Sequence, residues 1–134
     1  MGRGLASFQR RFRDMPEQAR AAADPAIVAA ANDMADDMRG LAPKVSGRLA
    51  GSVDVTGPGQ STPPHSQPGG SMIVPENAAA ITVGNAAVRY AHLVEYGTKR
   101  TVAKPFFMIG FALGRKQAAQ QIKTALRRAI RGQT

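Results

Sequence analysis

Apolar side chains near the N-terminus recur at the spacing of a helix. Four of them fall on one side of a helical turn: Leu5, Phe8, Phe12 and Met15. Pro16 ends or interrupts this helix, because its ring removes a backbone hydrogen bond that would continue it. We therefore expect a helical arm over residues 1–22.

A second helix is expected to begin at Asp24 and Pro25. An aspartate can accept hydrogen bonds from the free N–H groups of a first helical turn, and proline suits the first helical position. Beyond this start the apolar residues again keep to one side of a helix: Ile27, Ala31, Met34, Ala35, Met38 and Leu41. Gly40 and Pro43 predict the end of the helix.

The middle of the chain has the pattern of short strands. A strand over residues 49–56 is predicted by three apolar residues at even separations: Leu49, Val53 and Val55. Two further short strands are expected at residues 72–74 and 79–83. The three strands would pair into a small antiparallel sheet.

A proline- and glycine-rich segment follows the first of these strands. Residues 57–70 contain no charged side chain and no apolar side chain other than proline. Such a segment buries too little apolar surface to fold alone, so we predict a flexible loop over residues 57–71. A long loop in a compact domain is usually functional or disordered, and in an assembling protein it can order against a neighbouring subunit.

A long amphipathic helix is expected from about Pro105 to Arg131. Its apolar side comprises six residues: Phe107, Phe111, Ala118, Ile122, Leu126 and Ile130. With 134 residues the chain fits a single domain, residues 1–134. The expected fold class is α+β, with a small antiparallel sheet packed on two or three helices and this long C-terminal amphipathic helix.

Positive charge is concentrated in the last third of the chain. The net charge is +9, and no acidic residue follows Glu95. The C-terminal helix carries six cations: Arg115, Lys116, Lys123, Arg127, Arg128 and Arg131. Because neutralising phosphates releases counterions, these residues are candidates for contact with DNA or with an acidic protein surface. A solvated helix face that aids solubility is an equally open interpretation.

Few residues in the chain suit catalysis or metal binding. There is no cysteine, and the two histidines, His65 and His92, lack the spacing of a metal-ligand pair. His92 and Glu95 would share a side of a helical turn, but a lone pair between apolar residues is more typical of a buried hydrogen bond than of acid–base catalysis. We therefore expect no enzymatic activity, no catalytic residue, no cofactor and no metal. The apolar runs are too short for a membrane span, so we expect a soluble protein.

Two segments of the chain together resemble a known group of phage proteins. The first runs from Leu41 to Val53 (LAPKVSGRLAGSV), and the second runs from Tyr90 to Thr98 (YAHLVEYGT) and is followed by AKPFF at residues 103–107. With the helices around them, they resemble the small neck and tail-completion (tail terminator-like) proteins of long-tailed bacteriophages and related particles. This group includes proteins similar to the lambda minor tail protein Z. The resemblance extends over most of residues 24–131.

The matching residues are candidates for structural or interface roles: Gly47, Leu49, Tyr90, Glu95, Tyr96, Gly97, Thr98, Pro105, Phe106 and Phe107. Gly47 and Gly97 permit backbone conformations denied to other residues. Glu95 is expected to pair with a cation such as Arg48 or Arg89. Pro105 would start the last helix, and the two phenylalanines after it would anchor the core or a subunit contact.

The resemblance implies a structural virion protein at the phage head-to-tail junction. It would be a homo-oligomer, a ring of about six copies, that completes or terminates the tail and joins it to the head. Its partners would be other neck, connector and tail-tube proteins, with DNA passing through the channel and no membrane. Its location would be the neck or top of the tail, after synthesis in the bacterial cytoplasm. The alternative is a basic nucleic-acid-binding module.

Overall fold

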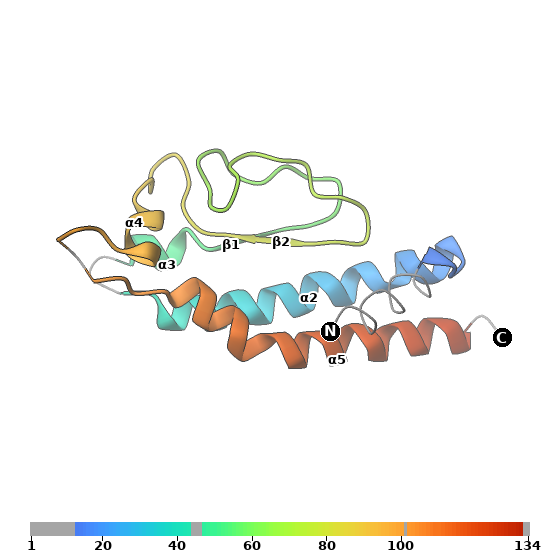
Figure 1. Cartoon of the computed structure of the whole chain (residues 1–134). Helices are drawn as coiled ribbons and strands as arrows, with labels where there is room; N and C mark the ends of the chain where they lie inside the picture. The colour runs from blue at the N-terminus through green and yellow to red at the C-terminus, as the bar shows by residue number, and fades with distance from the viewer. Residues whose placement is uncertain (1–12, 44–46, 101, 133–134) are drawn as a thin grey trace.

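The computed structural model describes residues 13–43, 47–100 and 102–132, and it confirms an α+β fold. The elements follow one another along the chain as α2 (Glu17–Leu41), α3 (Arg48–Gly51), β1 (Asp54–Thr56), β2 (Ala80–Thr82), α4 (Ala91–Tyr96) and α5 (Phe106–Gly132). Helices α2 and α5 lie side by side and antiparallel in one layer, and the strands with their loops form a second layer over them (Figure 1). Most of the arm expected over residues 1–22 lies outside the described residues.

Helix α2 begins at Glu17, so the start expected at Asp24 and Pro25 is wrong. Pro16 occupies the cap position, and Pro25 lies inside the helix. The residues between the two prolines are mostly alanine and other strong helix formers. Their helix propensity outweighs the single backbone hydrogen bond that Pro25 removes. The end of α2 at Leu41 agrees with the prediction from Gly40 and Pro43.

A side chain from the strand layer supports the helical turn before Pro25. The Nδ2 group of Asn77 donates to the carbonyl of Arg20 and to the carboxylate of Asp24, each at 2.9 Å. Asn77 has a φ of 58°, a conformation that asparagine adopts more readily than most residues. Asp24 therefore ties the loop before β2 to α2 and does not cap a helix.

Two glycines let α5 pack closely against α2. A Cβ atom on Gly110 would lie 2.5 Å from Cγ of Met38 and 3.1 Å from its backbone nitrogen and Cα atoms. A Cβ atom on Gly114 would lie 3.1 Å from Cγ of Met34. At Gly110 the two helix backbones therefore approach more closely than a side chain would allow, whereas at Gly114 the close neighbours are side-chain atoms. The extent of α5 confirms the long C-terminal helix.

Strands β1 and β2 pair antiparallel, with Val55 opposite Ile81, as expected for a small antiparallel sheet. The sequence predicted Leu49 in the first strand, and this prediction is wrong, because Leu49 lies in the short helix α3. The Ser52 hydroxyl donates to the Leu49 carbonyl at 2.7 Å and accepts the N–H of Gly84 at 3.0 Å. This buried hydroxyl closes a helical turn, so the strand begins only after it.

The proline- and glycine-rich segment is joined to the sheet by backbone hydrogen bonds. Gln67 exchanges two of them with Val83, at 2.8 and 3.1 Å. Thr62 and Ser66 are buried in spite of their polar side chains, and both hydroxyls donate to the carbonyl of Gly70. The flexibility of residues 57–71 stays a prediction.

The strand expected at residues 72–74 does not form. Ile73 instead makes an isolated antiparallel bridge with Ser61, and Val74 donates its N–H to the carbonyl of Gln60 at 2.8 Å. The segment therefore pairs with the proline-rich loop and not with the first strand. Sequence periodicity could not reveal this, because the loop partner has no apolar pattern of its own.

The core lies between α2, the beginning of α5 and the sheet. Its buried members are Met34, Ala35, Met38, Ala42, Leu49, Val53, Val83, Val88, Ala91 and Phe106. The predicted apolar side of α2 is confirmed at Met34, Ala35 and Met38, whereas Leu41 is 43% exposed. The core reaches the point where α4 meets α5, which is where the most exposed apolar side chains also gather.

Candidate assembly surface

The second sequence motif folds into a compact junction between α4 and α5. Helix α4 ends at Gly97, whose φ of 77° and ψ of 177° lie in a region that is nearly restricted to glycine. The chain then folds back onto α4, because the N–H of Lys104 donates to the carbonyl of Val94 at 2.8 Å. Pro105 stands directly before Phe106, the first residue of α5, so the helix begins one residue later than the sequence predicted.

Glu95 connects the two helices through hydrogen bonds. Its side chain is 6% exposed, and its two carboxylate oxygens accept the backbone N–H groups of Phe107 and Met108, each at 3.0 Å. The first N–H groups of a helix have no partner within the helix and carry partial positive charge, so a carboxylate stabilises this end. The sequence led us to expect a cation such as Arg48 or Arg89 at Glu95. The partners that the structure gives to both oxygens are N–H groups of α5.

The aromatic residues of the motif occupy different environments. Phe106 is 2% exposed and belongs to the core, and Phe107 packs half-buried beside it. Tyr90 precedes the first residue of α4 and is partly exposed, whereas Tyr96 at the end of α4 is 75% exposed. Phe106 is therefore an anchor of the subunit itself, while Tyr96 is presented to solvent.

The other candidate residues shape the backbone or the core. Gly47 precedes α3 with a φ of 76°, in the left-handed region that favours glycine. Leu49 is buried in the same core cluster as Phe106, so the two sequence motifs meet in the core. Thr98 is exposed, and its Oγ1 accepts the N–H of Arg100 at 3.2 Å.

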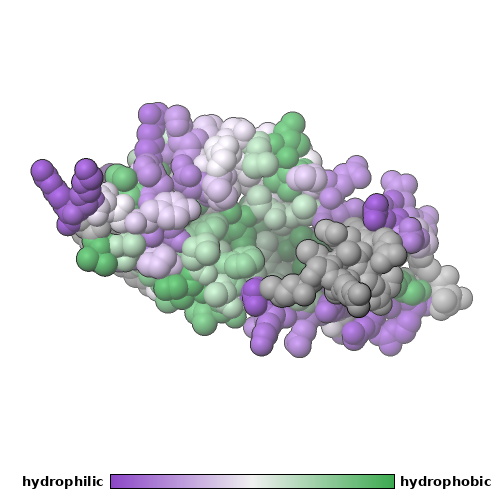
Figure 2. All heavy atoms as spheres, in the orientation of Figure 1, coloured by the Kyte–Doolittle hydropathy of each residue, from purple (hydrophilic) through white to green (hydrophobic). Residues whose placement is uncertain are grey.

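Large apolar side chains are exposed where α4 meets α5. We name this surface the apolar end, and it comprises Leu93, Tyr96, Val102, Met108, Ile109 and Leu113. Val102 is 83% exposed, and Tyr96 and Met108 line a shared cavity of about 130 Å³. Figure 2 shows hydrophobic atoms at the surface in this part of the molecule. A helix segment that is apolar on every side is normally buried, so this surface is suited to contact with another protein.

From Arg115 onward α5 has a different surface, which we name the cationic half. All six of its cations are exposed: Arg115, Lys116, Lys123, Arg127, Arg128 and Arg131. The helix contains no acidic residue, and Gln121 holds this half against α2 by donating to the Asp33 carboxylate at 3.0 Å. One helix therefore presents an apolar surface near its beginning and a cationic surface toward its end.

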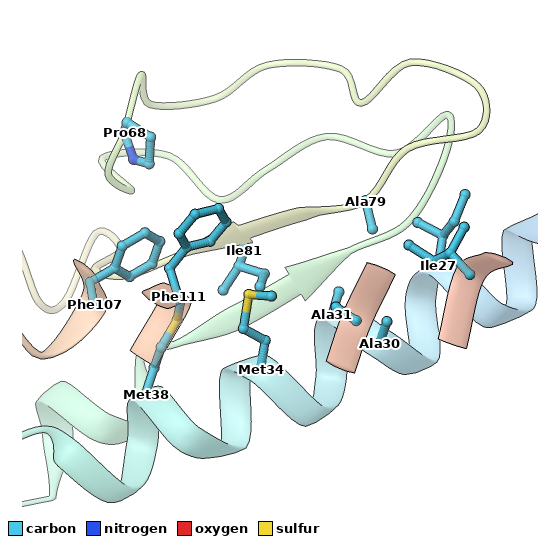
Figure 3. A pocket seen from close by; sticks show the side chains of 12 residues that line it. Ile27, Ala30, Ala31, Met34, Met38, Pro68, Ala79, Ile81, Phe107 and Phe111 are labelled. Atoms are coloured by element: carbon cyan, nitrogen blue, oxygen red, sulfur yellow. The ribbon is translucent and has the colours of Figure 1, made fainter. Parts of the chain in front are cut away.

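An apolar groove of about 330 Å³ runs between α2, α5 and the strand layer. Its walls are formed by aliphatic, methionine and phenylalanine side chains of the three elements, with Pro68 of the proline-rich loop above them. In Figure 3 the rings of Phe107 and Phe111 lie next to each other near Met38 and Ile81. The groove extends along α2 as far as Ile27.

Two features of the structure were not predicted from the sequence, namely the close contact between α5 and α2 at glycine and the apolar end. Gly110 and Gly114 are four residues apart and therefore share a face of α5, which is the signal that would have identified the helix contact. The apolar end was missed because residues 106–114 contain no charged side chain at all. Without polar positions, periodicity cannot tell which side of a helix faces solvent.

Metal and membrane sites can be assessed for the described residues. Among them, no group of three or more His, Cys, Asp or Glu side chains is placed to hold a metal ion. His92 is exposed on α4, whereas Glu95 is engaged with α5. None of the helices described is both long and apolar enough to cross a bilayer.

Comparison with known proteins identifies the family. A family model described as "Bacteriophage HK97-gp10, putative tail-component" matches residues 6–97, more than half of the 134 residues. The chain belongs to this family. Membership in the HK97 gp10-like family supports a structural, tail-related role and confirms the phage-tail part of the resemblance. The closer similarity to the lambda minor tail protein Z stays a prediction.

The extent of the match differs from the extent of the resemblance. It begins within the N-terminal arm and ends at Gly97, so it includes α2, both strands and α4 but not α5. No curated protein and no solved structure matches the chain significantly.

Proposed function

We propose that this member of the HK97 gp10-like family is a subunit of a ring at the junction between phage head and tail, where it completes or terminates the tail. The ring would hold about six copies, contact neck, connector and tail-tube proteins, and leave a channel for DNA. The subunit would reside in the virion, at the neck or the top of the tail. This role is mechanical and requires no catalytic group.

The exposure of the apolar end is the main support for this proposal. Burying a large apolar side chain contributes about 1.5–3 kcal/mol. Association costs on the order of 4–15 kcal/mol in lost freedom of motion, so a single exposed side chain would not suffice. The apolar end offers six such side chains on connected segments: Leu93, Tyr96, Val102, Met108, Ile109 and Leu113.

The position of the apolar end also favours a ring. It lies at one extremity of the elongated helix pair, and the opposite extremity carries the last cations of α5, Arg127, Arg128 and Arg131 (Figure 1). A contact between unlike surfaces of successive copies is heterologous, and heterologous contacts close into rings or continue as filaments. A protein that connects two parts of a phage particle requires such a repeatable contact.

A charged substitution at the apolar end tests the proposal. Val102→Asp places a carboxylate on the most exposed large apolar side chain among the described residues, without disturbing the core. Ile73→Asp is the matched control, because Ile73 is 69% exposed and lies in the strand layer. Sedimentation velocity should show a closed oligomer for the wild type and for Ile73→Asp, and a monomer for Val102→Asp. An identical oligomer for all three proteins would contradict the proposed contact.

The cationic half of α5 supports a second candidate, a nucleic-acid-binding module. Its six exposed cations would give affinity that falls steeply with salt. Replacing Lys123 and Arg127 by Gln should then reduce the slope of log affinity against log salt by about one per lost phosphate contact. Salt-dependent DNA binding by the monomer would favour this candidate, and rings without DNA affinity would favour assembly.

A further inference from the structure

The segment between α4 and α5 projects from the molecule as a tip, which we define as residues 97–100 and 102–104. It extends beyond the ends of the two long helices (Figure 1). Val102 on the tip is 83% exposed, and Tyr96 at its base is 75% exposed. The tip is held at its far end, because the N–H of Lys104 donates to the carbonyl of Val94 at 2.8 Å. A segment that is already held loses little freedom on binding, so this tip is suited to enter a recess.

The apolar groove between α2, α5 and the strand layer is such a recess. The described residues that line it include no polar or charged side chain. Phe111 is 47% exposed although it lines the groove, and Ile27 and Ile81 are half-buried along its walls. Figure 2 shows a recessed hydrophobic area between the strand layer and the helices. A hollow of about 330 Å³ can take several aliphatic side chains.

The charges beside the tip and the groove are opposite in sign. The tip carries three exposed cations: Lys99, Arg100 and Lys104. Two acids lie at the Ile27 end of the groove. Asp24 is about one helical turn before Ile27, and the exposed Glu76 is next to Asn77, whose side chain donates to Asp24. Arg20 lies on the preceding turn, but it is half-buried and its Nε atom is buried. Opposite charges around an apolar contact favour this pairing, whereas two tips would bring like charges together.

We infer that the tip of one copy enters the apolar groove of the next copy, with Val102 near Ile27 and the tip's cations beside Asp24 and Glu76. The tip projects away from α2 and the strands of its own chain, so the groove it enters belongs to another copy (Figure 1). Tip and groove are different surfaces, so the contact is heterologous and every copy uses both. The inference rests on the proposed ring and identifies the two surfaces of its repeating contact.

The absence of cysteine from the chain allows a test by disulfide formation. Full-length Val102→Cys protein is mixed with full-length Ile27→Cys protein, and the mixture assembles before mild oxidation. The matched control uses Ile73→Cys in place of Val102→Cys, because Ile73 is 69% exposed in the strand layer. The dimer that joins positions 102 and 27 should form at least about tenfold faster than the control dimer, since assembly raises the local concentration of the two thiols.

The results that overturn the inference differ from those that overturn the ring. Equal rates in the two mixtures would refute the contact, and so would a predominant disulfide between two Val102→Cys chains, which would show that tips meet each other. Sedimentation velocity of the wild type separates the two proposals. A closed oligomer without the disulfide between positions 102 and 27 would refute the tip–groove contact alone. A wild-type monomer would refute both.

A second variant covers the case in which the cysteine variants fail to fold. Ala79 is half-buried and lines the groove, so Ala79→Phe fills the groove without changing the tip (Figure 3). Ala29→Phe is the matched control, because Ala29 is exposed and lies nearly opposite Ile27 around α2. Ala79→Phe should sediment as a monomer with the far-UV circular dichroism of the wild type, and Ala29→Phe should keep the oligomer. A wild-type oligomer of Ala79→Phe would overturn the inference.

Discussion

Replacing Gly110 with alanine tests whether α5 and α2 are in backbone contact. The new Cβ atom would lie 2.5 Å from Cγ of Met38 and 3.1 Å from its Cα and nitrogen atoms. The Met38 side chain can rotate, but its backbone belongs to α2 and moves only with the helix. Overpacking of this kind costs about 1–3 kcal/mol, while exchanging glycine for alanine in a helix returns about 1 kcal/mol.

The net expectation for Gly110→Ala is a loss of about 0–2 kcal/mol in the free energy of unfolding. For a chain of this length, the upper limit corresponds to a fall of about 8 °C in the midpoint of thermal unfolding. The measurement is a thermal melt followed by circular dichroism at 222 nm. It is made under conditions in which unfolding is reversible, because the free energy applies only there.

Two further glycines provide a graded comparison. At Gly114 the nearest atom to a new Cβ is Cγ of Met34 at 3.1 Å, and Met34 contributes flexible side-chain atoms, so Gly114→Ala should be close to neutral. Gly40 has nothing within 4 Å, so Gly40→Ala should be neutral or raise stability by up to about 1 kcal/mol. If Gly110→Ala stabilises the protein as much as Gly40→Ala does, the close helix contact is refuted.

Two other substitutions and one deletion follow from the structure. Glu95→Ala removes both acceptors at the beginning of α5 and should cost about 2–4 kcal/mol in urea unfolding, and a loss below about 0.5 kcal/mol would contradict the capping role. Gly97→Ala forces a side chain into a glycine conformation and should cost about 1–3 kcal/mol, whereas Gly51→Ala, which has open space around it, should cost little. Deleting residues 59–69 should abolish ring formation while far-UV circular dichroism shows a folded subunit. An unfolded deletion variant would mean that the loop's backbone bonds are needed by the sheet.

The helices could be predicted from the sequence because their apolar positions repeat over many turns. Met34, Met38 and Leu126 are buried, as their spacing requires. Prediction from local sequence failed where two tendencies competed. At Pro25, the helix propensity of an alanine-rich stretch outweighed the helix-breaking effect of proline. Prediction also failed at Leu49, because the hydroxyl of Ser52 closes a turn that even spacing of apolar residues cannot reveal.

The candidate site could be predicted only in part. The motif residues around Glu95 do gather at one junction, and its glycine does have the unusual backbone that the sequence indicated. The partner of Glu95 could not be foreseen, because the N–H groups of Phe107 and Met108 become available only when α5 begins beside α4. The groove was equally hidden, since it arises from the packing of α2, α5 and β2.

Separate parts of this small chain have separate structural roles. Glycine contacts and the Glu95 carboxylate fix the angle and position of α5. Once α5 is fixed, its first turns present apolar side chains at one extremity and its later turns present positive charge. In the proposed role, this combination supplies a repeatable subunit contact and a surface that tolerates nearby DNA phosphates.

Inactivation of the gene in the phage that encodes this chain shows whether the tail can be completed without the protein. Electron microscopy of the lysate should show DNA-filled heads and tails that are not joined, and wild-type protein supplied in trans should restore complete particles. The Val102→Asp protein should fail to restore them. Complete, infectious particles at wild-type yield without the protein would contradict a role in completing the tail.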